Sequence, residues 1–248
     1  MHKVSCACSY DSVQDFCLYG RIAVTMEKQE RVQLYIDGGN FHHLVLKKMS
    51  LKEIEFSFDE FANFLANGRE VTGKRYYIGT VREKEGDLKS REAMARQTKF
   101  FTVLASYGWE IKTSKLRTRI EKIVIDQRVK NYAELRRQGV YEIELERTRE
   151  KGIDVKLATD LIVGAVDNQY DTAIVVSSDA DLVPAMDWIR YRLKKKVEYI
   201  GFSLLDKADA RYSTRPLQTM ISKSDIQRIL VESDLKPFCK PFVQQKLV

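Results

Sequence analysis

From residue 31 onward, short apolar runs alternate with longer amphipathic stretches, which is typical of strands alternating with helices. Strand length and β-prone composition are found in RVQLYI (31–36), KRYYIGTV (74–81), WEIKTSKL (109–116), TAIVVSS (172–178) and KKVEYIGF (195–202). We therefore predict an α/β domain with a mainly parallel sheet, helices on both faces and right-handed crossovers.

Apolar positions between these runs follow helical spacing. We expect a helix from Phe41 to about Met49, a second from the capping-box segment at Ser57 to Gly68, and a third from Lys89 to Tyr107. Two further helices are expected over 157–166 and 180–193, and one near the C-terminus from Ser224 to Val231. Trp109 and Trp188 stand at apolar spacings, so we expect both in the core.

The regular pattern divides the chain into three regions. We interpret residues 1–28 as a flexible leader and Met26 as a candidate for the true start. Residues 29–205 form the predicted domain, and residues 206–248 a helical extension. Residues 112–150 interrupt the alternation of strands and helices. They are polar and carry both charge signs, so we predict a basic insertion or helical arm there.

Length and composition narrow the class of protein. A chain of 248 residues with 44% apolar and 31% charged residues suits one α/β domain with appendages. No apolar run reaches the length of a membrane span, and four cysteines do not make a disulfide scaffold, so we expect a cytoplasmic protein without a membrane partner. Cys6, Cys8 and Cys17 lie in the leader, where their spacing is only a weak zinc signal.

The charge excess is concentrated in one segment. The chain carries a net charge of +7, and residues 112–137 hold nine basic and three acidic residues. Such a run is either a solvated face or a surface for an anionic polymer, and we favour RNA. The candidate RNA-binding residues are Lys112, Lys115, Arg117, Arg119, Lys122, Arg128, Lys130, Arg136 and Arg137.

Aspartates follow two of the predicted strands and open one of the helices. Asp37 ends the first strand, Asp179 and Asp181 follow the fourth, and Asp154 precedes the helix over 157–166. Each acid alone could be a turn residue or a helix cap. Ligands, however, collect at the carboxyl ends of parallel strands. Close carboxylates repel by about 4 kcal/mol at 4 Å and an effective dielectric of 20. A divalent cation would offset this cost, so the pattern indicates metal-dependent phosphodiester chemistry.

Three blocks of sequence together resemble the signature of NYN domains, a PIN-like nuclease family that includes the LabA-type bacterial proteins. The blocks are YIDGGNF (35–41), KGIDVKLATDLIVGAV (151–166) and VVSSDADLVPAM (175–186), and the resemblance covers roughly residues 31–203. It implies a Rossmann-like, three-layer PIN/NYN fold and a ribonuclease that uses Mg²⁺ or Mn²⁺, with an endonucleolytic mode favoured.

The resemblance also implies roles for individual residues. Asp37, Asp154, Asp179 and Asp181 would hold the metal and carry catalysis, with Asn40 supporting Asp37. Asp160 and Ser178 match secondary positions. We rank Asp160 lower, because six residues along a helix turn it away from Asp154, and we expect Ser178 to cap a helix.

Three alternatives remain open at the level of sequence. One is a non-catalytic RNA-binding or regulatory module on the same fold. Another is a phosphotransfer domain, which we disfavour because Asp37 is followed by Gly-Gly-Asn rather than by a second acid. A solvated role for the basic segment is the third. The sequence leaves open whether the chain forms a homodimer and whether His42 or His43 takes part in chemistry, and no small-molecule cofactor is expected.

Overall fold

A computed structural model of the chain describes residues 29–240 apart from 82, 84–85, 151 and 207–208, and describes residues 115–118 and 148–150 by their backbone only. The predicted leader lies outside the described residues. None of the described helices is long and apolar enough to cross a membrane.

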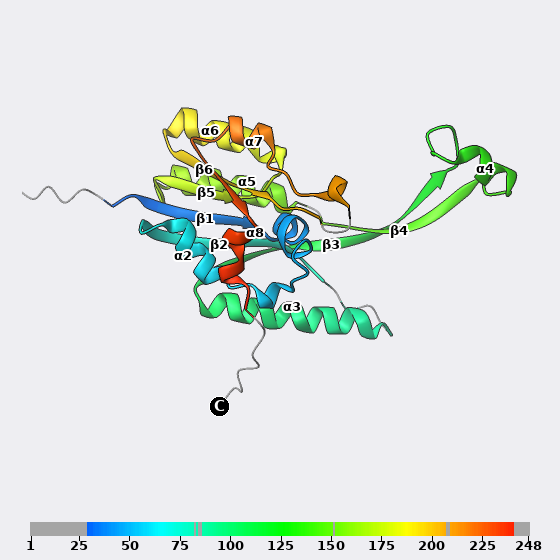
Figure 1. Cartoon of the computed structure of the whole chain (residues 1–248), viewed down its shortest axis with the longest axis horizontal. Coiled ribbons are helices and arrows are strands. Elements are labelled where there is room, and N and C mark those ends of the chain that lie inside the picture. Colours follow the sequence, from blue (N-terminus) through cyan, green and yellow to red (C-terminus); the bar gives the residue numbers. More distant parts are fainter. Residues whose placement is uncertain (1–28, 82, 84–85, 151, 207–208, 241–248) are drawn as a thin grey trace, which may run out of the picture.

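A seven-stranded sheet with the order β4-β3-β2-β1-β5-β6-β7 forms the centre of the protein (Figure 1). Its strands are β1 (Arg31–Asp37), β2 (Glu70–Thr80), β3 (Trp109–Val124), β4 (Glu142–Glu150), β5 (Thr172–Val176), β6 (Lys196–Ser203) and β7 (Ile226–Val231). Six of them run parallel, and only β4 is antiparallel to its neighbour β3. The predicted α/β class and mainly parallel sheet are confirmed.

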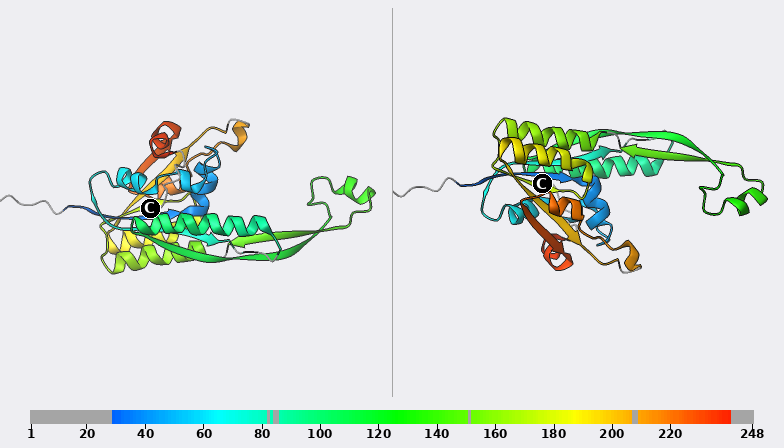
Figure 2. Two further views of the ribbon diagram at one scale, coloured as in Figure 1. Left: turned by 90° about the horizontal axis from the view of Figure 1, so that it is seen from below. Right: turned by 90° about the horizontal axis from the view of Figure 1, so that it is seen from above.

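The helices cover both faces of this sheet, as Figure 2 shows for α5 and α6 on one side and α1 and α8 on the other. They are α1 (Gly38–Phe41), α2 (Phe58–Ala66), α3 (Leu88–Ser106), α4 (Tyr132–Arg137), α5 (Ile153–Val166), α6 (Val183–Leu193), α7 (Gln218–Ser222) and α8 (Glu232–Leu235). Further helical segments are the π-helix η1 (His42–Leu46) and the 3-10 helices η2 (Glu53–Glu55), η3 (Ala180–Leu182), η4 (Ala210–Tyr212) and η5 (Lys236–Phe238).

Alternation along the central strand β1 divides the apolar residues into two cores. Val32, Leu34 and Ile36 pack with phenylalanines of α1, α2 and α3 on one face. Tyr35 packs on the other face with α5, α6 and α7. Successive residues of a strand point to opposite faces, so a strand buried on both sides must be apolar at nearly every position. All five residues of β5 are buried for this reason.

The sequence predicted an insertion or a helical arm over 117–150, and the structure shows a β-ribbon there, so the helical arm is wrong. β3 pairs with β2 as far as Lys115 and then continues to Val124 as a two-stranded antiparallel ribbon with β4. Only α4, at the tip, is helical. The reason is a two-residue alternation of charged and apolar side chains, as in Glu142-Ile143-Glu144-Leu145, which the density of charges obscured. We call residues 116–150 the arm; it projects well away from the body (Figure 1).

The predicted helix from Ser224 to Val231 is also wrong, because residues 226–231 form the edge strand β7, parallel to β6. Ile226, Ile229 and Leu230 have helical spacing in the sequence. Pairing with β6 decides the outcome, since it satisfies the backbone and buries Leu230. The sheet therefore extends beyond residue 205. Trp109 is buried as expected, whereas Trp188 is 39% exposed on α6.

Candidate active site at the carboxyl edge of the sheet

Asp37 is fixed in a buried position where β1 passes into α1. Its side chain is 6% exposed, and its Oδ1 accepts a hydrogen bond of 2.9 Å from the Asn40 backbone N–H, which caps α1. Its Oδ2 accepts a bond of 3.1 Å from the Ser177 hydroxyl, at the end of β5. The carboxylate is therefore both a helix cap and a group held in one orientation by two neighbouring strands.

Gly38 allows α1 to begin directly against the sheet. A Cβ at this position would lie 2.5 Å from Cε1 of Tyr76 on β2, which no ordinary contact permits. Tyr76 is fully buried, and its pKa is raised well above the usual value by burial first and then by the charges of Glu53 and Asp37. The close approach of Gly38 to this ring thus helps to place Asp37 at the edge of the sheet.

A network of hydrogen bonds links Asp37 to the turn after β5. The Ser177 hydroxyl that donates to Asp37 also accepts from the Asp179 backbone N–H at 3.2 Å, and the Asn40 side chain accepts from the Ser178 N–H at 3.0 Å. Asp179 in turn caps η3 by accepting from the Asp181 N–H at 2.9 Å. Asn40 contacts both ends of this network, through its backbone N–H to Asp37 and its side chain to Ser178, and its supporting role stays a prediction. Ser177, which the sequence analysis missed, is the residue that connects the two aspartates.

Ser178 does not cap a helix. Its hydroxyl lies 2.9 Å from the hydroxyl of Tyr199 on β6, and the capping of η3 belongs to Asp179. The expected capping role of Ser178 is therefore wrong. The adjacent serines take opposite sides of the strand end, so that only Ser177 faces Asp37.

Asp154 lies in the first turn of α5, after the N-cap Gly152, whose φ of 84° is readily adopted only by glycine. The pKa of Asp154 is raised by partial burial first, and then by the charges of Asp179 and Asp181. The N-terminus of a helix would lower it, so the direction of the shift indicates that burial and the neighbouring acids dominate. Asp179 is partly buried and Asp181 is exposed.

We call Asp37, Asp154, Asp179 and Asp181 the edge aspartates. Three separate segments of the chain deliver them to the same edge of the sheet: the end of β1, the start of α5 and the turn after β5. Hydrogen bonds connect Asp37 with Asp179, and electrostatic coupling connects Asp154 with Asp179 and Asp181. The prediction that parallel-strand topology brings these distant positions to one edge agrees with this arrangement.

Asp160 is engaged elsewhere. Its carboxylate accepts a hydrogen bond of 2.8 Å from the Tyr77 hydroxyl and lies 3.8 Å from Nζ of Lys112. These contacts join α5 to β2 and β3. The structure therefore does not bring Asp160 to the edge aspartates, in agreement with its angular offset from Asp154 on the helix.

The histidines after Asn40 lie on η1. His42 Nδ1 is 2.8 Å from Glu53 Oε1, so its ring is directed toward η2. His43 is exposed, and its pKa is lowered by desolvation and by the neighbouring His42 and Lys47. Neither histidine has a hydrogen bond or ion pair with an edge aspartate among the interactions of the described residues.

The nine candidate RNA-binding residues do not form one surface. Lys112 lies on the body, paired with Glu110 and Asp160, and Lys122 pairs with Glu144 at 2.8 Å. Near the tip of the arm, Arg128 pairs with Asp126, Arg136 lies over the Tyr141 ring, and Lys130 and Arg137 are exposed. Arg119 is exposed on β3, while Lys115 and Arg117 are described by backbone only.

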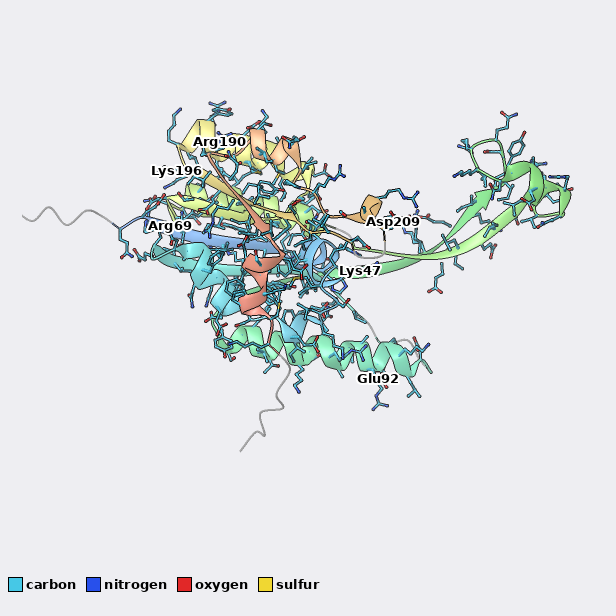
Figure 3. All side chains as sticks on the ribbon, in the orientation of Figure 1. Lys47, Arg69, Glu92, Arg190, Lys196 and Asp209 are labelled. Carbon is cyan, nitrogen blue, oxygen red and sulfur yellow. The ribbon has the colours of Figure 1, made fainter. Side chains whose placement is uncertain are left out.

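Strand β4 changes the charge balance of the arm. Four of its residues, Glu142, Glu144, Glu146 and Glu150, are acidic, so residues 112–150 hold eleven basic and seven acidic residues. The excess computed for 112–137 alone is thus partly compensated by the returning strand. Figure 3 shows the side chains of the arm extending into solvent on both sides of the ribbon.

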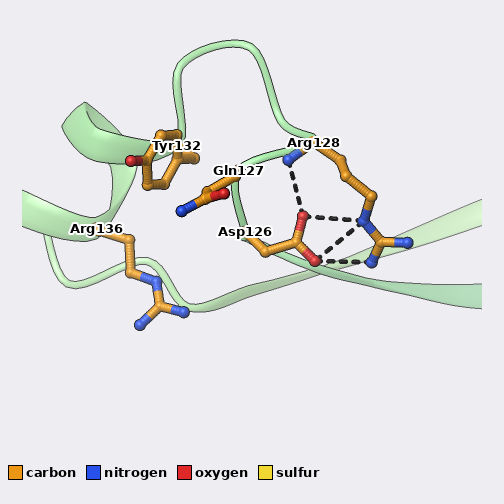
Figure 4. A pocket seen from close by; sticks show the side chains of 5 residues that line it. All are labelled: Asp126, Gln127, Arg128, Tyr132 and Arg136. Atoms are coloured by element: carbon orange, nitrogen blue, oxygen red, sulfur yellow. Dashed lines mark hydrogen bonds and ion pairs between the residues drawn. The ribbon is translucent and has the colours of Figure 1, made fainter.

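Two hollows lie away from the edge aspartates. One, of about 710 Å³, is at the tip of the arm and is lined by Asp126, Gln127, Arg128, Tyr132 and Arg136 (Figure 4). The other, of about 570 Å³, lies between η2, β2 and α3, with Ile78 and Phe100 among its lining residues. Arg128 and Asp126, both lining the first hollow, form an ion pair, and its hydrogen bonds account for the lowering of the pKa of Asp126 to about 2.

The edge aspartates have the donor chemistry for a hard divalent cation, since Mg²⁺ and Mn²⁺ prefer carboxylate oxygens. The pKa of Asp154 is raised by burial first and then by the charges of Asp179 and Asp181, and a cation would offset this second contribution. Among the described residues, however, no three histidines, cysteines or acids are arranged to hold an ion. The side chains fit the group in kind and location, and a cation would have to draw them closer together.

Comparison with known proteins places the chain in a family. A crystal structure of a protein of unknown function from Vibrio parahaemolyticus is similar, with 19% identity and a TM-score of 0.47 over 83% of this chain and 96% of that one. No curated protein shows significant similarity. Residues 31–218 match the NYN domain, whose family is PIN-like and nuclease-like. Since this match covers more than half of the sequence, the chain belongs to the NYN domain family.

Proposed function

We propose that this protein is a metal-dependent ribonuclease that hydrolyses RNA phosphodiester bonds, endonucleolytically, with Mg²⁺ or Mn²⁺ held by the edge aspartates. The observation that carries the proposal is the delivery of acids from three segments to one sheet edge, where burial first, and then the charges of Asp179 and Asp181, raise the pKa of Asp154. Clustered acids with a shifted pKa are more typical of a functional site than of ordinary capping.

Electrostatics explains why a cation belongs to this proposal. RNA is a polyanion, so carboxylates at the edge would repel it unless their charge is neutralised. Two such charges 4 Å apart repel by about 4 kcal/mol at an effective dielectric of 20. When bound, Mg²⁺ or Mn²⁺ supplies a Lewis acid for the phosphate and an activated water.

The chain's own residues provide the orientation. Asp37 is held by the Asn40 N–H and the Ser177 hydroxyl, so it would meet the ion in a fixed geometry and at little entropic cost. Asn40 and Ser177 are positioning residues, because they act through Asp37 and Asp179. Asp181, exposed in η3, would complete the ligand set from the solvent side.

Asp37→Asn tests the proposal with a change of one charge at nearly constant volume. We expect the cleavage of single-stranded RNA in Mn²⁺ to fall by about a hundredfold or more, because a lost electrostatic group at a catalytic centre typically costs this much. Asp167→Asn is the matched control, since Asp167 is exposed at the other end of α5. Equal rates for Asp37→Asn and the control would refute the assignment.

One observation favours a second candidate, a non-catalytic RNA-binding module. In the part of the chain that the structure describes, the edge aspartates are not arranged to hold an ion without rearrangement. On this alternative the protein binds RNA in EDTA and leaves it intact when Mn²⁺ is added. Cleavage by the wild-type protein, lost in Asp37→Asn, decides against it.

A further inference from the structure

The register of the arm places four of its seven arginines in two cross-strand pairs two residues apart. Arg119 of β3 lies opposite Arg147 of β4, and Arg117 lies opposite Arg149. Cross-strand partners share a face of a ribbon, and positions two apart along a strand share that face too. The backbone register therefore assigns positions 117, 119, 147 and 149 to one face, which we call the arginine face.

The opposite face has the opposite charge. Glu142, Glu144 and Glu146 alternate along β4 with the positions of the arginine face, and all three are exposed. Lys122, their neighbour on β3, lies 2.8 Å from Glu144 and 3.9 Å from Glu142. We call this side the glutamate face. The small net charge of the arm thus conceals a separation of charge between two sides.

The described arginines of the arginine face are poorly compensated. Arg119 is exposed and makes no hydrogen bond or ion pair with another described residue. Arg147 has one ion pair, at 3.1 Å from Glu121, and its side chain is 52% exposed. Like charges directly opposite each other destabilise a ribbon, so the Arg119–Arg147 pair carries a cost that a bound anion would relieve.

The arginine face also begins next to the candidate active site. β3 leaves β2 at the Thr80–Lys115 pair, at the carboxyl end of β2, which is the edge where Asp37 ends β1. β4 returns to the same place, and Asp154 follows Arg149 by only five residues. A polymer bound along the arm would therefore reach the edge aspartates directly.

We propose that the arginine face binds the phosphates of a single-stranded RNA segment that runs from the edge aspartates along the arm. This inference rests on the proposed function and names the form of its substrate. A ribbon inserted into a groove would present both faces to phosphates, and the glutamate face would repel them. A single strand lies against one face only, which is the arrangement that the separated charges permit.

The binding set differs from the one that the sequence suggested. Arg147 and Arg149 enter it, because β4 places them opposite Arg119 and Arg117. Lys122 belongs to the glutamate face, and Arg128 is paired with Asp126 at the tip. Specificity for single strands would thus come from the register of a hairpin and not from the number of basic residues.

The test compares two pairs of charge reversals in the full chain. Arg119→Glu with Arg147→Glu alters the arginine face, and Lys130→Glu with Arg137→Glu makes the same change of charge at exposed positions near the tip. Binding of an RNA single strand of about 16 nucleotides, the upper end of the site sizes of single-strand binding folds, is measured in EDTA over a range of salt. The Kd should rise about tenfold or more, and the salt slope should fall by about 1.4 for two lost phosphate contacts, only in the first variant.

A second variant guards against misfolding of the ribbon. Arg119→Gln with Arg147→Gln removes the opposed charges without adding acids, so the ribbon should be at least as stable and should still bind RNA more weakly than wild type. Unchanged Kd in this folded variant would overturn the proposal, as would equal losses in the tip control. Binding of a duplex of equal length as tightly as the single strand would also overturn it.

A small substrate distinguishes RNA binding by the arginine face from hydrolysis at the edge aspartates. Bis(p-nitrophenyl) phosphate in Mn²⁺ is too small to touch the arm, so the glutamine variant should hydrolyse it at the wild-type rate. Loss of RNA binding with this rate intact supports the arginine face. If the wild-type protein hydrolyses neither substrate, the nuclease proposal fails while the EDTA binding data still decide on the arm.

Discussion

At the scale of the residue, Ser177 connects two edge aspartates although nothing in the sequence marks it as part of the site. One hydroxyl, 1% exposed, donates to Asp37 and accepts from the Asp179 backbone, and so joins two edge aspartates. The sequence shows two serines before Asp179, and nothing in composition or spacing distinguishes them. The side of the strand that each one faces decides their roles, and this depends on the tertiary pairing of β5 with β1 and β6.

Ser177→Ala is expected to weaken both the fold and the site. It deprives the buried Asp37 carboxylate of a donor, which typically costs about 1–3 kcal/mol of unfolding free energy. RNA cleavage should fall as well, since Asp37 and Asp179 lose their common support. Urea unfolding and cleavage rates check both effects against Ser106→Ala, at an exposed serine near the end of α3. A midpoint and rate equal to those of this control would contradict the positioning role.

Asp154→Asn is expected to stabilise the metal-free protein at neutral pH. The pKa of Asp154 is raised in the folded state by burial and by Asp179 and Asp181. Its charged form is therefore disfavoured there, and folding stability is lost as pH rises through this pKa. The variant should have the higher unfolding temperature in EDTA at neutral pH, and the difference should vanish when the carboxyl is protonated, below its ordinary value of 3.8. A lower unfolding temperature for the variant at neutral pH would be inconsistent with the crowding of acids.

At the scale of the element, strands marked by continuous apolar runs could be predicted, whereas strands whose alternation is obscured by charges, or whose spacing also suits a helix, could not. The central strands β1 and β5 have apolar runs that only a doubly covered strand requires. β7 and the distal half of β3 depend on a partner, β6 and β4 respectively, and their own sequences are ambiguous. The arginine face could not be predicted from either strand alone, because it depends on the register in which β3 pairs with β4.

An ion pair at the amino end of the sheet joins β1 to the turn before β5. Arg31 donates from its backbone N–H and its guanidinium to Asp171, and the side-chain bond is the main cause that lowers the pKa of Asp171 to about 2. A lowered pKa stabilises the fold above the ordinary value of 3.8, and this contribution is lost as pH falls toward about 2.

Asp171→Asn should accordingly lower the unfolding temperature at neutral pH. The gap between variant and wild type should narrow from about pH 4 to about pH 2, over the interval in which the wild-type carboxyl gains its proton. Thermal unfolding across this range checks the sign. A gap that stays constant through the interval would show that the ion pair does not contribute in this way.

At the scale of the whole molecule, the topology of the sheet explains why the candidate site could be predicted in outline. Parallel strands place their carboxyl ends at one edge, so the sequence alone predicts that Asp37, Asp179 and Asp181 lie near each other. The start of α5 adds Asp154. The geometry of the ligands and the structure of the arm could not be predicted from the sequence. The arm contributes little to the net charge of +7, because its nine basic residues are set against seven acidic ones, but its register separates these charges into a basic and an acidic face beside the site.

Metal binding by the edge aspartates is tested most directly by an anomalous difference map from crystals of the full chain soaked with Mn²⁺. We predict a peak at the carboxyl edge of the sheet, bound by Asp37 and by at least one of Asp154, Asp179 and Asp181, with these side chains drawn closer than in the metal-free protein. A fully occupied Mn²⁺ site elsewhere, or no peak at this edge at saturating Mn²⁺, would contradict the assignment of the metal to the edge aspartates.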